Sequence, residues 1–493
     1  MGKVSVAVTV QVFRIQTGNR MKLHRVIIFL AAFLLVPRAI FAADVPASRP
    51  NIIFILADDM GWNDLHCYGH PYAKTPNIDK LAAEGTRFGQ CYATGVTCCP
   101  SRTGFMTSRF PASFAKYPAN GGFADRVTIT ELLHKQGYAT GHFGKWHIGP
   151  NEKSGTYGID TVSADDGGGK KKTPAVRGRD AHFYDEAIKF IEAHKGGPFY
   201  VNIWDHIPHH PVNPSQAVVD AFGPLQVDES KFSPEMQTKF AMCKKLGGDV
   251  SVHMRAWLAE IKAMDDEVGM LMKRLDELGL SENTIIAFSS DQGPADIRDP
   301  AEKVKVKDNK KDKTPVGDGN NTTDIRLNAM GYAGSFRGGK HNQYEGGVRI
   351  PFIVRWPGHI QAGRFDEKSV ISGADWLPTL CAITGTKIIA NDYDGEDASA
   401  AWLGKKELTR TKPLMWKTSS PNSEGAIRDG NWKLHHPNSK RGEPELYDVA
   451  ADPGERNNLA IKKPEIVKQL STKLEAWQAT LPKEYDKTSD GDK

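Results

Sequence analysis

The stretch Asn51-Ile52-Ile53-Phe54-Ile55-Leu56-Ala57, followed by Asp58-Asp59-Met60-Gly61, decides the fold of this chain. A continuous apolar run of this length, directly after a proline, predicts a β-strand that is buried on both of its faces. Such strands belong to sheets that are covered by helices on both sides. Similar apolar runs recur further along the chain, at 199–204, 284–288 and 351–354.

Segments with helical periodicity lie between these runs. Residues 182–194 place Phe183, Ala187 and Phe190 at helical spacing, and residues 253–279 form a longer candidate helix. Alternating strands and helices favour an α/β fold, so we predict a large doubly wound mixed sheet flanked by helices.

The pattern changes after about residue 405. Short alternating segments at 413–416 and 425–435 precede a candidate helix at about 464–480. This pattern predicts a smaller C-terminal antiparallel sheet plus one helix. We therefore divide the chain into an N-terminal extension with a signal peptide, a main α/β domain and a C-terminal α+β subdomain, with the ranges 1–43, 44–404 and 405–493.

The N-terminal segment has the layout of a secretory signal peptide. A basic start at 21–25 precedes the apolar run 26–36, and small residues follow at Ala39, Ala42 and Ala43. The apolar run is much shorter than the roughly 20 residues of a membrane-spanning helix. We predict export, to the periplasm or the extracellular space or to a lysosome-like compartment in a eukaryote, without stable membrane association. An uncleaved N-terminal anchor is the alternative.

Removal of this segment changes the charge of the chain. Residues 1–42 hold six positive and no negative side chains, so the formal net charge falls from +5 to −1. The charge therefore gives no support for nucleic-acid binding. Two charged segments, 165–172 and 299–324, read as solvated insertions, although a rim that contacts an anionic polymer is the alternative.

Acidic and imidazole side chains follow several of the predicted strands. Asp58-Asp59 comes after the first run, Asp291-Gln292 after the third, and the segment 205–211 contains His206, His209 and His210. Ligands of doubly wound sheets bind beyond the carboxyl ends of the strands. We therefore expect these side chains to meet at one edge of the sheet.

The segment that begins Cys98-Cys99-Pro100-Ser101-Arg102 suggests a reactive centre. The six cysteines match no zinc-binding spacing, and a vicinal pair makes a poor structural disulfide. Pro100 suits the first turn of a helix that starts just after Cys98, and Arg102 adds a cation to the anion-favouring helix start. This pattern predicts an anion site beside a sulfur nucleophile. The pattern alone does not decide the chemistry at Cys98, because an ordinary cysteine thiolate that acts as the nucleophile would also fit it.

The motif Cys98-x-Pro-Ser-Arg, with Met106-Thr107, resembles the signature of the type I, formylglycine-dependent sulfatases of the alkaline-phosphatase-like superfamily. The likeness is to the arylsulfatase and N-acetylgalactosamine-6-sulfatase group. Further matches are spread along the chain, at 56–61, 75–79, 144–149, 290–293, 337–340, 344–349, 446–448, 452–453 and 458–459.

The resemblance implies a sulfuric ester hydrolase that acts on sulfated carbohydrates. In this family the first cysteine of the signature, here Cys98, becomes formylglycine, whose hydrate attacks sulfur and forms a covalent sulfate intermediate. A formylglycine-generating enzyme or an anaerobic maturase would carry out that conversion. The family also implies one Ca²⁺ ion, held by Asp58, Asp59, the converted Cys98, Asp291 and Gln292.

The resemblance also assigns the remaining site residues. Arg102, Lys145 and Lys340 would hold the sulfate and the hydrate. His147 would hydrogen-bond the hydrate, and His209 with Lys340 would protonate the leaving oxygen. Weaker candidates for substrate contact are His206, His210 and His341.

Three residues depart from the family pattern. Gln292 stands where the family most often has asparagine, Ser108 follows Met106-Thr107 in place of glycine, and His341 follows Lys340 in place of glycine. Two other functions remain open: a phosphate or phosphonate ester hydrolase of the same superfamily, and a non-catalytic glycan-binding protein in which Cys98 is never oxidised.

Overall fold

The computed structural model describes residues 49–115, 121–149, 153–164, 177–297, 325–388, 393–417, 425–436 and 442–483. All of them belong to one unit of the chain, residues 47–493. The predicted signal peptide and the charged segments 165–172 and 299–324 lie outside the described residues. Within the described ranges, every helix is too short or too polar to span a membrane.

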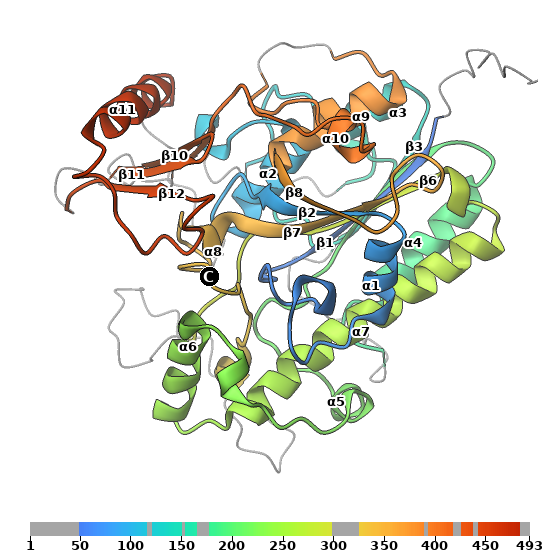
Figure 1. Cartoon of the computed structure of the whole chain (residues 1–493). Helices are drawn as coiled ribbons and strands as arrows, with labels where there is room; N and C mark the ends of the chain where they lie inside the picture. Colours follow the sequence, from blue (N-terminus) through green and yellow to red (C-terminus); the bar gives the residue numbers. More distant parts are fainter. Residues whose placement is uncertain are drawn as a thin grey trace, which may run out of the picture. The chain divides into compact units, whose positions relative to one another are not determined.

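Eight strands form the main sheet in the order β4-β3-β5-β1-β6-β7-β2-β8 (Figure 1). Their bounds are β1 Asn51–Ala57, β2 Thr86–Tyr92, β3 Ala139–Gly144, β4 Thr161–Ala164, β5 Phe199–Trp204, β6 Thr284–Ser290, β7 Arg349–Arg355 and β8 Arg364–Ser372. Strands β3, β5, β1 and β6 are parallel neighbours, whereas β7 runs antiparallel to both β6 and β2. The predicted mixed sheet is confirmed.

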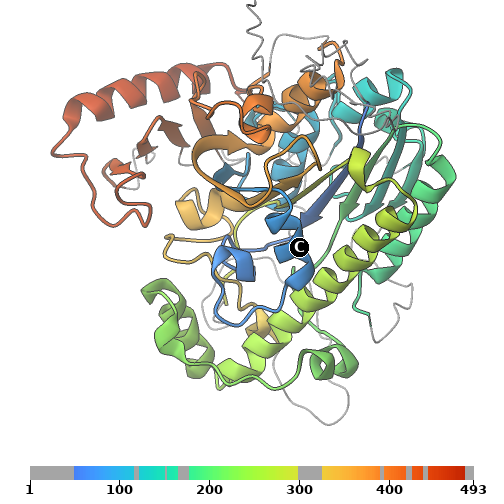
Figure 2. The same cartoon turned by 45° about the vertical axis from the view of Figure 1, so that its right-hand side comes forward.

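Helices cover both faces of this sheet. One face carries α1 Pro76–Ala83, α4 Ala181–His194, α5 Gln216–Phe222, α6 Pro234–Lys245 and α7 Val250–Glu277. The other carries α2 Cys98–Thr107, α3 Ile129–Lys135, α9 Trp376–Thr384 and α10 Ser399–Trp402. Figure 2 shows the long helix α7 crossing the first of these faces.

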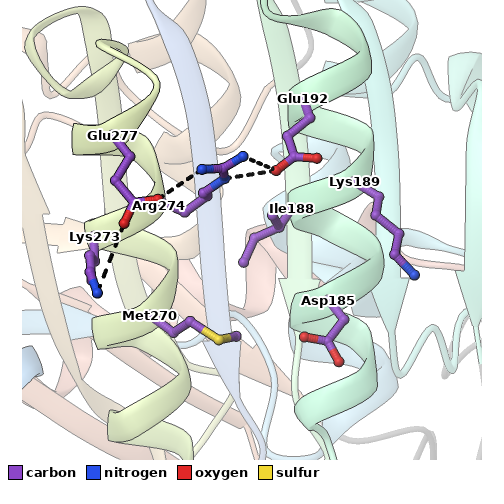
Figure 3. Close-up of a pocket in the computed structure, with 8 residues that line it drawn as sticks. All are labelled: Asp185, Ile188, Lys189, Glu192, Met270, Lys273, Arg274 and Glu277. Carbon is purple, nitrogen blue, oxygen red and sulfur yellow. Dashed lines mark hydrogen bonds and ion pairs between the residues drawn. The ribbon is translucent and has the colours of Figure 1, made fainter.

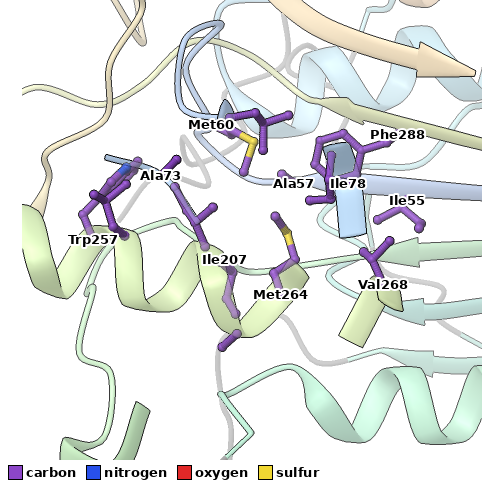
Figure 4. Close-up of a cluster of buried hydrophobic side chains, with 14 of the residues drawn as sticks. Ile55, Ala57, Met60, Ala73, Ile78, Ile207, Trp257, Met264, Val268 and Phe288 are labelled. Carbon is purple, nitrogen blue, oxygen red and sulfur yellow. The ribbon is translucent and has the colours of Figure 1, made fainter. Parts of the chain in front are cut away.

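The apolar run of β1 is continuous because the strand contributes to two cores. Ile53 and Ile55 join the cluster that contains Met264 and Val268 of α7 (Figure 4). The alternate side chains point to the opposite face, where the Phe54 ring stacks on Trp376 of α9 with 4.3 Å between ring centroids. Since burial of each large apolar side chain contributes about 1.5–3 kcal/mol, this run anchors the sheet at its centre.

A second sheet of four antiparallel strands, β12-β11-β10-β9, follows near the C-terminus. Its elements are β9 Leu414–Lys417, β10 Gly425–Asp429, β11 Trp432–His436, β12 Glu445–Asp448 and the helix α11 Pro464–Ala479. The segment 425–435 is thus two strands of a hairpin, which turns at Gly430 with a positive φ of 58°. The predicted small sheet with one helix is confirmed, and the domain boundary at 404/405 stays a prediction.

Candidate active site

Four neighbouring parallel strands end at one edge of the main sheet. Asp58 and Asp59 follow β1, Asp291 and Gln292 follow β6, and Lys145 follows β3. The backbone N–H of Asp59 donates to Asp291 Oδ1 at 3.1 Å, so the ends of β1 and β6 are tied together. The side chains are buried, and the expected meeting of charged groups at this edge is what the structure shows.

Three of the predicted site residues adopt an unusual backbone conformation. Asp59, His147 and His341 have φ values of 64°, 58° and 72°, in the left-handed region that residues with a Cβ rarely occupy. Such strain persists only where the surrounding structure imposes it, and it concentrates at functional sites. The three residues come from three distant segments that sequence reasoning had already placed in the site.

Cys98 is the first residue of α2, rather than the residue before the helix as the sequence suggested, and Pro100 lies in the first turn. Its Sγ lies 3.1 Å from Asp58 Oδ1, 3.2 Å from Gln292 Nε2 and 3.6 Å from Lys340 Nζ. Burial, together with the Asp58 charge, raises the pKa of the Cys98 thiol well above its usual value. A thiol held protonated in this way is a weak nucleophile.

Three cations balance the three carboxylates. Lys145 Nζ donates to Asp58 Oδ2 at 2.5 Å, and Lys340 Nζ donates to Asp59 Oδ2 at 3.2 Å. Burial alone would raise the pKa of Asp58, but the neighbouring charges, with Lys145 foremost, hold that pKa well below its usual value. The cluster is close to neutral, so an added divalent cation would make it an attractive place for an anion.

Arg102 connects several strand ends within the cluster. Its Nε donates to Asp291 Oδ2 at 3.0 Å, and its Nη1 donates to the backbone oxygen of Lys145 at 2.9 Å. The guanidinium also lies over the Trp204 ring, 5.2 Å from its centroid. One side chain therefore ties α2 to the ends of β6, β3 and β5.

His209 reaches the cluster from the segment after β5. Its Nε2 lies 3.1 Å from Lys340 Nζ and 3.7 Å from Asp59 Oδ2. Burial lowers the pKa of His209 to about 3, so the ring is neutral. Its Nδ1 lies 2.5 Å from the backbone oxygen of His210, which can only accept, so Nδ1 carries the proton. Nε2 is then the acceptor for a Lys340 N–H.

The other predicted imidazoles lie outside this cluster. His206 Nδ1 lies 3.1 Å from Asp180 Oδ1, the His210 ring stacks on His209 at 4.3 Å, and the His341 side chain is exposed. His147 is half-buried two residues beyond Lys145, and it makes no hydrogen bond to Cys98 within the described part of the chain. Its predicted contact with the hydrate stays a prediction.

Two residues that sequence reasoning missed hold the histidine segment in place. Arg179 Nη2 donates to the backbone oxygens of His206, at 2.9 Å, and His209, at 2.5 Å, while Asp180 accepts from the backbone N–H groups of His206 and Ile207. These are side-chain contacts to backbone across nearly 30 residues of sequence. Neither residue sits in a motif, so no signal in the sequence could have found them.

Comparison with known proteins identifies the type of enzyme. The family model described as Sulfatase matches residues 50–386. This chain belongs to the sulfatase family. A second model, described as N-sulphoglucosamine sulphohydrolase, C-terminal, matches residues 336–480. The chain is therefore a sulfuric ester hydrolase, and the resemblance found in the sequence motifs is confirmed.

Individual relatives cover nearly the whole chain. Human arylsulfatase A is 28% identical, with 90% of each chain covered. An N-acetylgalactosamine-6-O-sulfatase of Bacteroides thetaiotaomicron is also 28% identical, over 87% of this chain and 93% of the relative. Among solved structures, Ps i-CgsB in complex with k-i-k-neocarrahexaose superposes with a TM-score of 0.70 at 22% identity, over 90% of this chain and 96% of that one.

The residues of this sulfatase fit a bound cation. Oxygen, sulfur and nitrogen atoms of Asp58, Asp59, Cys98 and His209 all lie within 4.8 Å of one another. The Gln292 amide oxygen is buried and has no hydrogen-bond partner among the described residues, while its amide nitrogen faces Asp59 Oδ1. Because the two ends of an amide have almost the same shape, a half-turn would bring the oxygen beside Asp59, where a hard cation would stabilise both.

A shallow groove on the sulfatase lies between α4 and α7, away from this cluster (Figure 3). Four of its charged side chains pair with each other: Arg274 contacts both Glu192, at 2.7 Å, and Glu277, at 2.8 Å, and Lys273 lies 3.9 Å from Glu277. None of its lining residues belongs to the candidate active site. The groove is a solvated contact between two helices.

Proposed function

We propose that this sulfatase removes sulfate from sulfated carbohydrates and that oxidised Cys98 is its nucleophile. The proposal rests above all on the surroundings of Cys98. Its Sγ lies within 4.0 Å of polar atoms from Asp58, Asp59, Gln292 and Lys340, which come from three separate segments of the chain. A structural cysteine needs an apolar environment, whereas a reacting group needs fixed charges around it.

Conversion of Cys98 to the aldehyde supplies what the protonated thiol lacks. One hydroxyl of the hydrated aldehyde attacks sulfur, and the bond between sulfur and the alcohol oxygen of the substrate breaks. The second hydroxyl then loses its proton, the bond between carbon and the sulfate oxygen breaks, and the aldehyde returns as sulfate leaves. Arg102 and Lys145 neutralise charge at the attacking side.

The leaving oxygen needs a proton on the other side of the sulfur. Lys340 Nζ is bound to His209 Nε2 and to Asp59 Oδ2. Lys340 can therefore donate a proton to the leaving oxygen while neutral His209 accepts another Lys340 N–H and holds the ammonium in place. This assigns Lys340 as the proton donor and His209 as its partner.

Ca²⁺ is the cation that suits this oxygen-rich donor set best. When bound, it would neutralise sulfate oxygens and favour ionisation of the hydrate. Asp58, Asp59, Asp291, Gln292 and the converted Cys98 would hold it. A separate maturation enzyme must oxidise Cys98. The predicted signal peptide within residues 1–43 would direct the export of the protein.

The substrate class is proposed from the named relatives. One relative is named for N-acetylgalactosamine-6-O-sulfate esters, and one structural neighbour was solved with a neocarrahexaose. A screen of defined sulfated mono- and oligosaccharides for sulfate release tests this proposal, with the Cys98→Ala variant as the blank. We expect the enzyme with oxidised Cys98 to release sulfate from at least one sugar, and the Cys98→Ala variant to release none. Faster hydrolysis of aryl phosphates than of aryl sulfates, or release of nothing, would contradict it.

A further inference from the structure

The segment that carries Lys340 is fixed at two points on the active-site side. The Lys340 backbone N–H donates to the backbone oxygen of Pro294, two residues beyond Gln292, at 2.9 Å. The next N–H, of His341, donates to the backbone oxygen of Val96, two residues before Cys98, also at 2.9 Å. The backbone around Lys340 is thus tied to both sides of the candidate metal and nucleophile residues.

The same segment is fixed on its other side by the C-terminal sheet. Glu445 of β12 accepts three hydrogen bonds at one oxygen. Its Oε2 accepts from Arg337 Nη1 at 3.0 Å, from Tyr344 OH at 3.0 Å and from Tyr447 OH at 2.6 Å. Arg337 and Tyr344 flank Lys340 in sequence, and the guanidinium lies over the Tyr344 ring at 3.9 Å. Glu445 therefore closes the segment 337–344 into a loop.

A buried ion pair holds the end of this loop. Glu345, the first residue of α8 Glu345–Val348, pairs with Lys433 of β11 at 2.9 Å, and both side chains are fully buried. Its backbone N–H donates to Glu455 Oε2 at 2.6 Å. Figure 1 shows α8 at the start of β7, next to the C-terminal strands. The loop packs closely on this helix: the Gly346 N–H donates to the Arg337 backbone oxygen at 2.8 Å, and a Cβ on Gly347 would lie 2.1 Å from the backbone oxygen of Asn342.

We propose that the C-terminal sheet positions Lys340, with Glu445 as the principal positioning residue. Lys340 Nζ must lie within hydrogen-bond reach of three groups at once, and a small displacement of a proton donor is enough to lower a rate strongly. Glu445 does not touch the reacting atoms, so it acts through the loop. This inference rests on the proton-donor role proposed for Lys340 above.

The test uses two esters that differ in how much they need a proton. The leaving oxygen of 4-nitrophenyl sulfate departs readily as the anion, whereas that of phenyl sulfate is more basic and depends on a donor. The Glu445→Ala variant should lose about tenfold in kcat/KM on phenyl sulfate and far less on 4-nitrophenyl sulfate. The Glu445→Gln variant, which keeps an acceptor oxygen, should recover part of the loss.

The matched control is Asp429→Ala. Asp429 of β10 lies in the same sheet as Glu445 and pairs with Lys473 of α11, and the Asp429–Lys473 and Glu445–Arg337 pairs have identical side-chain exposures, 31% for each acid and 42% for each base. Among the described residues, Asp429 makes no hydrogen bond or ion pair with the loop, so its variant should show no preference between the two esters. In a Lys340→Ala background, Glu445→Ala should add no further selective loss.

Equal losses on both esters in Glu445→Ala, while Lys340→Ala is selective for phenyl sulfate, would overturn the positioning role and leave the proposed function intact. A selective loss that persists in the Lys340→Ala background would also overturn it. If Lys340→Ala itself lost kcat/KM equally on both esters, Lys340 would not be the proton donor, and the positioning role of Glu445 would be overturned as well.

Discussion

Arg102 Nε donates a hydrogen bond to Asp291 Oδ2 at 3.0 Å, and both side chains are fully buried. The pair joins the start of α2 to the end of β6. Burial raises the pKa of Asp291 to about 7, and the Arg102 charge works against that rise. This charged contact thus holds the helix that begins with Cys98, the proposed nucleophile, against Asp291, a candidate metal ligand, and it should contribute to stability.

Removal of Arg102 should destabilise the fold. Arg102→Ala leaves Asp291 buried without its charged partner, so we expect the free energy of unfolding in chelator to fall by about 3–5 kcal/mol. Urea unfolding measures this change. Arg274→Ala is the control, because Arg274 makes its ion pairs at the surface and its loss should hardly move the midpoint. Equal midpoints for the two variants would show that the buried pair contributes nothing.

Ca²⁺ should raise the melting temperature of the protein. A cation that binds only the folded state stabilises it, by about 2.7 kcal/mol at a hundredfold excess over its Kd. Differential scanning calorimetry with chelator and then with added Ca²⁺ measures the shift. Gln292→Ala should need more Ca²⁺ for the same shift, because the amide is a predicted ligand. Gln237→Ala, on α6, should respond as the wild type does, and the same response in both variants would remove Gln292 from the ligand set.

Cys98→Ser should trap sulfate on the enzyme. A serine hydroxyl can take the sulfate, but it lacks the second hydroxyl that expels it. Incubation with an aryl sulfate should therefore give one burst of phenol and a protein mass increased by one SO₃ group, because the serine supplies the fourth oxygen of the sulfate ester. Cys99→Ala, which changes the neighbouring cysteine, should turn over normally. Sustained turnover by Cys98→Ser would rule out the aldehyde mechanism.

Arg179 should matter for turnover although it lies outside the charged cluster. Its guanidinium holds the backbone oxygens of His206 and His209, so Arg179→Ala frees the segment that places His209 beside Lys340. We expect kcat to fall by about 10- to 100-fold, with Arg179→Lys less affected. Arg177→Ala is the comparison, because Arg177 pairs with Asp185 and Glu267 instead. Similar kcat values for the two alanine variants would contradict this role.

The sequence was most informative where burial and chemistry are local. The run 51–57 was predicted to be a strand with two buried faces, because six consecutive apolar residues between Pro50 and Asp58-Asp59 are typical of a central strand, and all seven residues of β1 are indeed buried. Asp58-Asp59 and Asp291-Gln292 were found because each directly follows such a strand. Parallel neighbours end at the same edge, so the meeting of these residues followed from the fold class.

Contacts between distant segments could not be read from the sequence. Arg179 and Glu445 act on backbone or side chains far along the chain, and nothing in their own neighbourhood distinguishes them from surface charges. The start of α2 at Cys98 was placed one residue late, because a helix boundary depends on hydrogen bonds that the residue types do not specify. His147 shows the reverse: a motif predicts its role, but among the described residues it makes no hydrogen bond to Cys98.

The mass of the peptide that contains Cys98 decides whether this residue becomes the aldehyde. It should be measured by mass spectrometry on a preparation that has just been shown to release sulfate. We expect a side chain that has lost its sulfur and two hydrogens and gained one oxygen, as the aldehyde requires. A fully active preparation in which this peptide carries only the unmodified Cys98 thiol would contradict it.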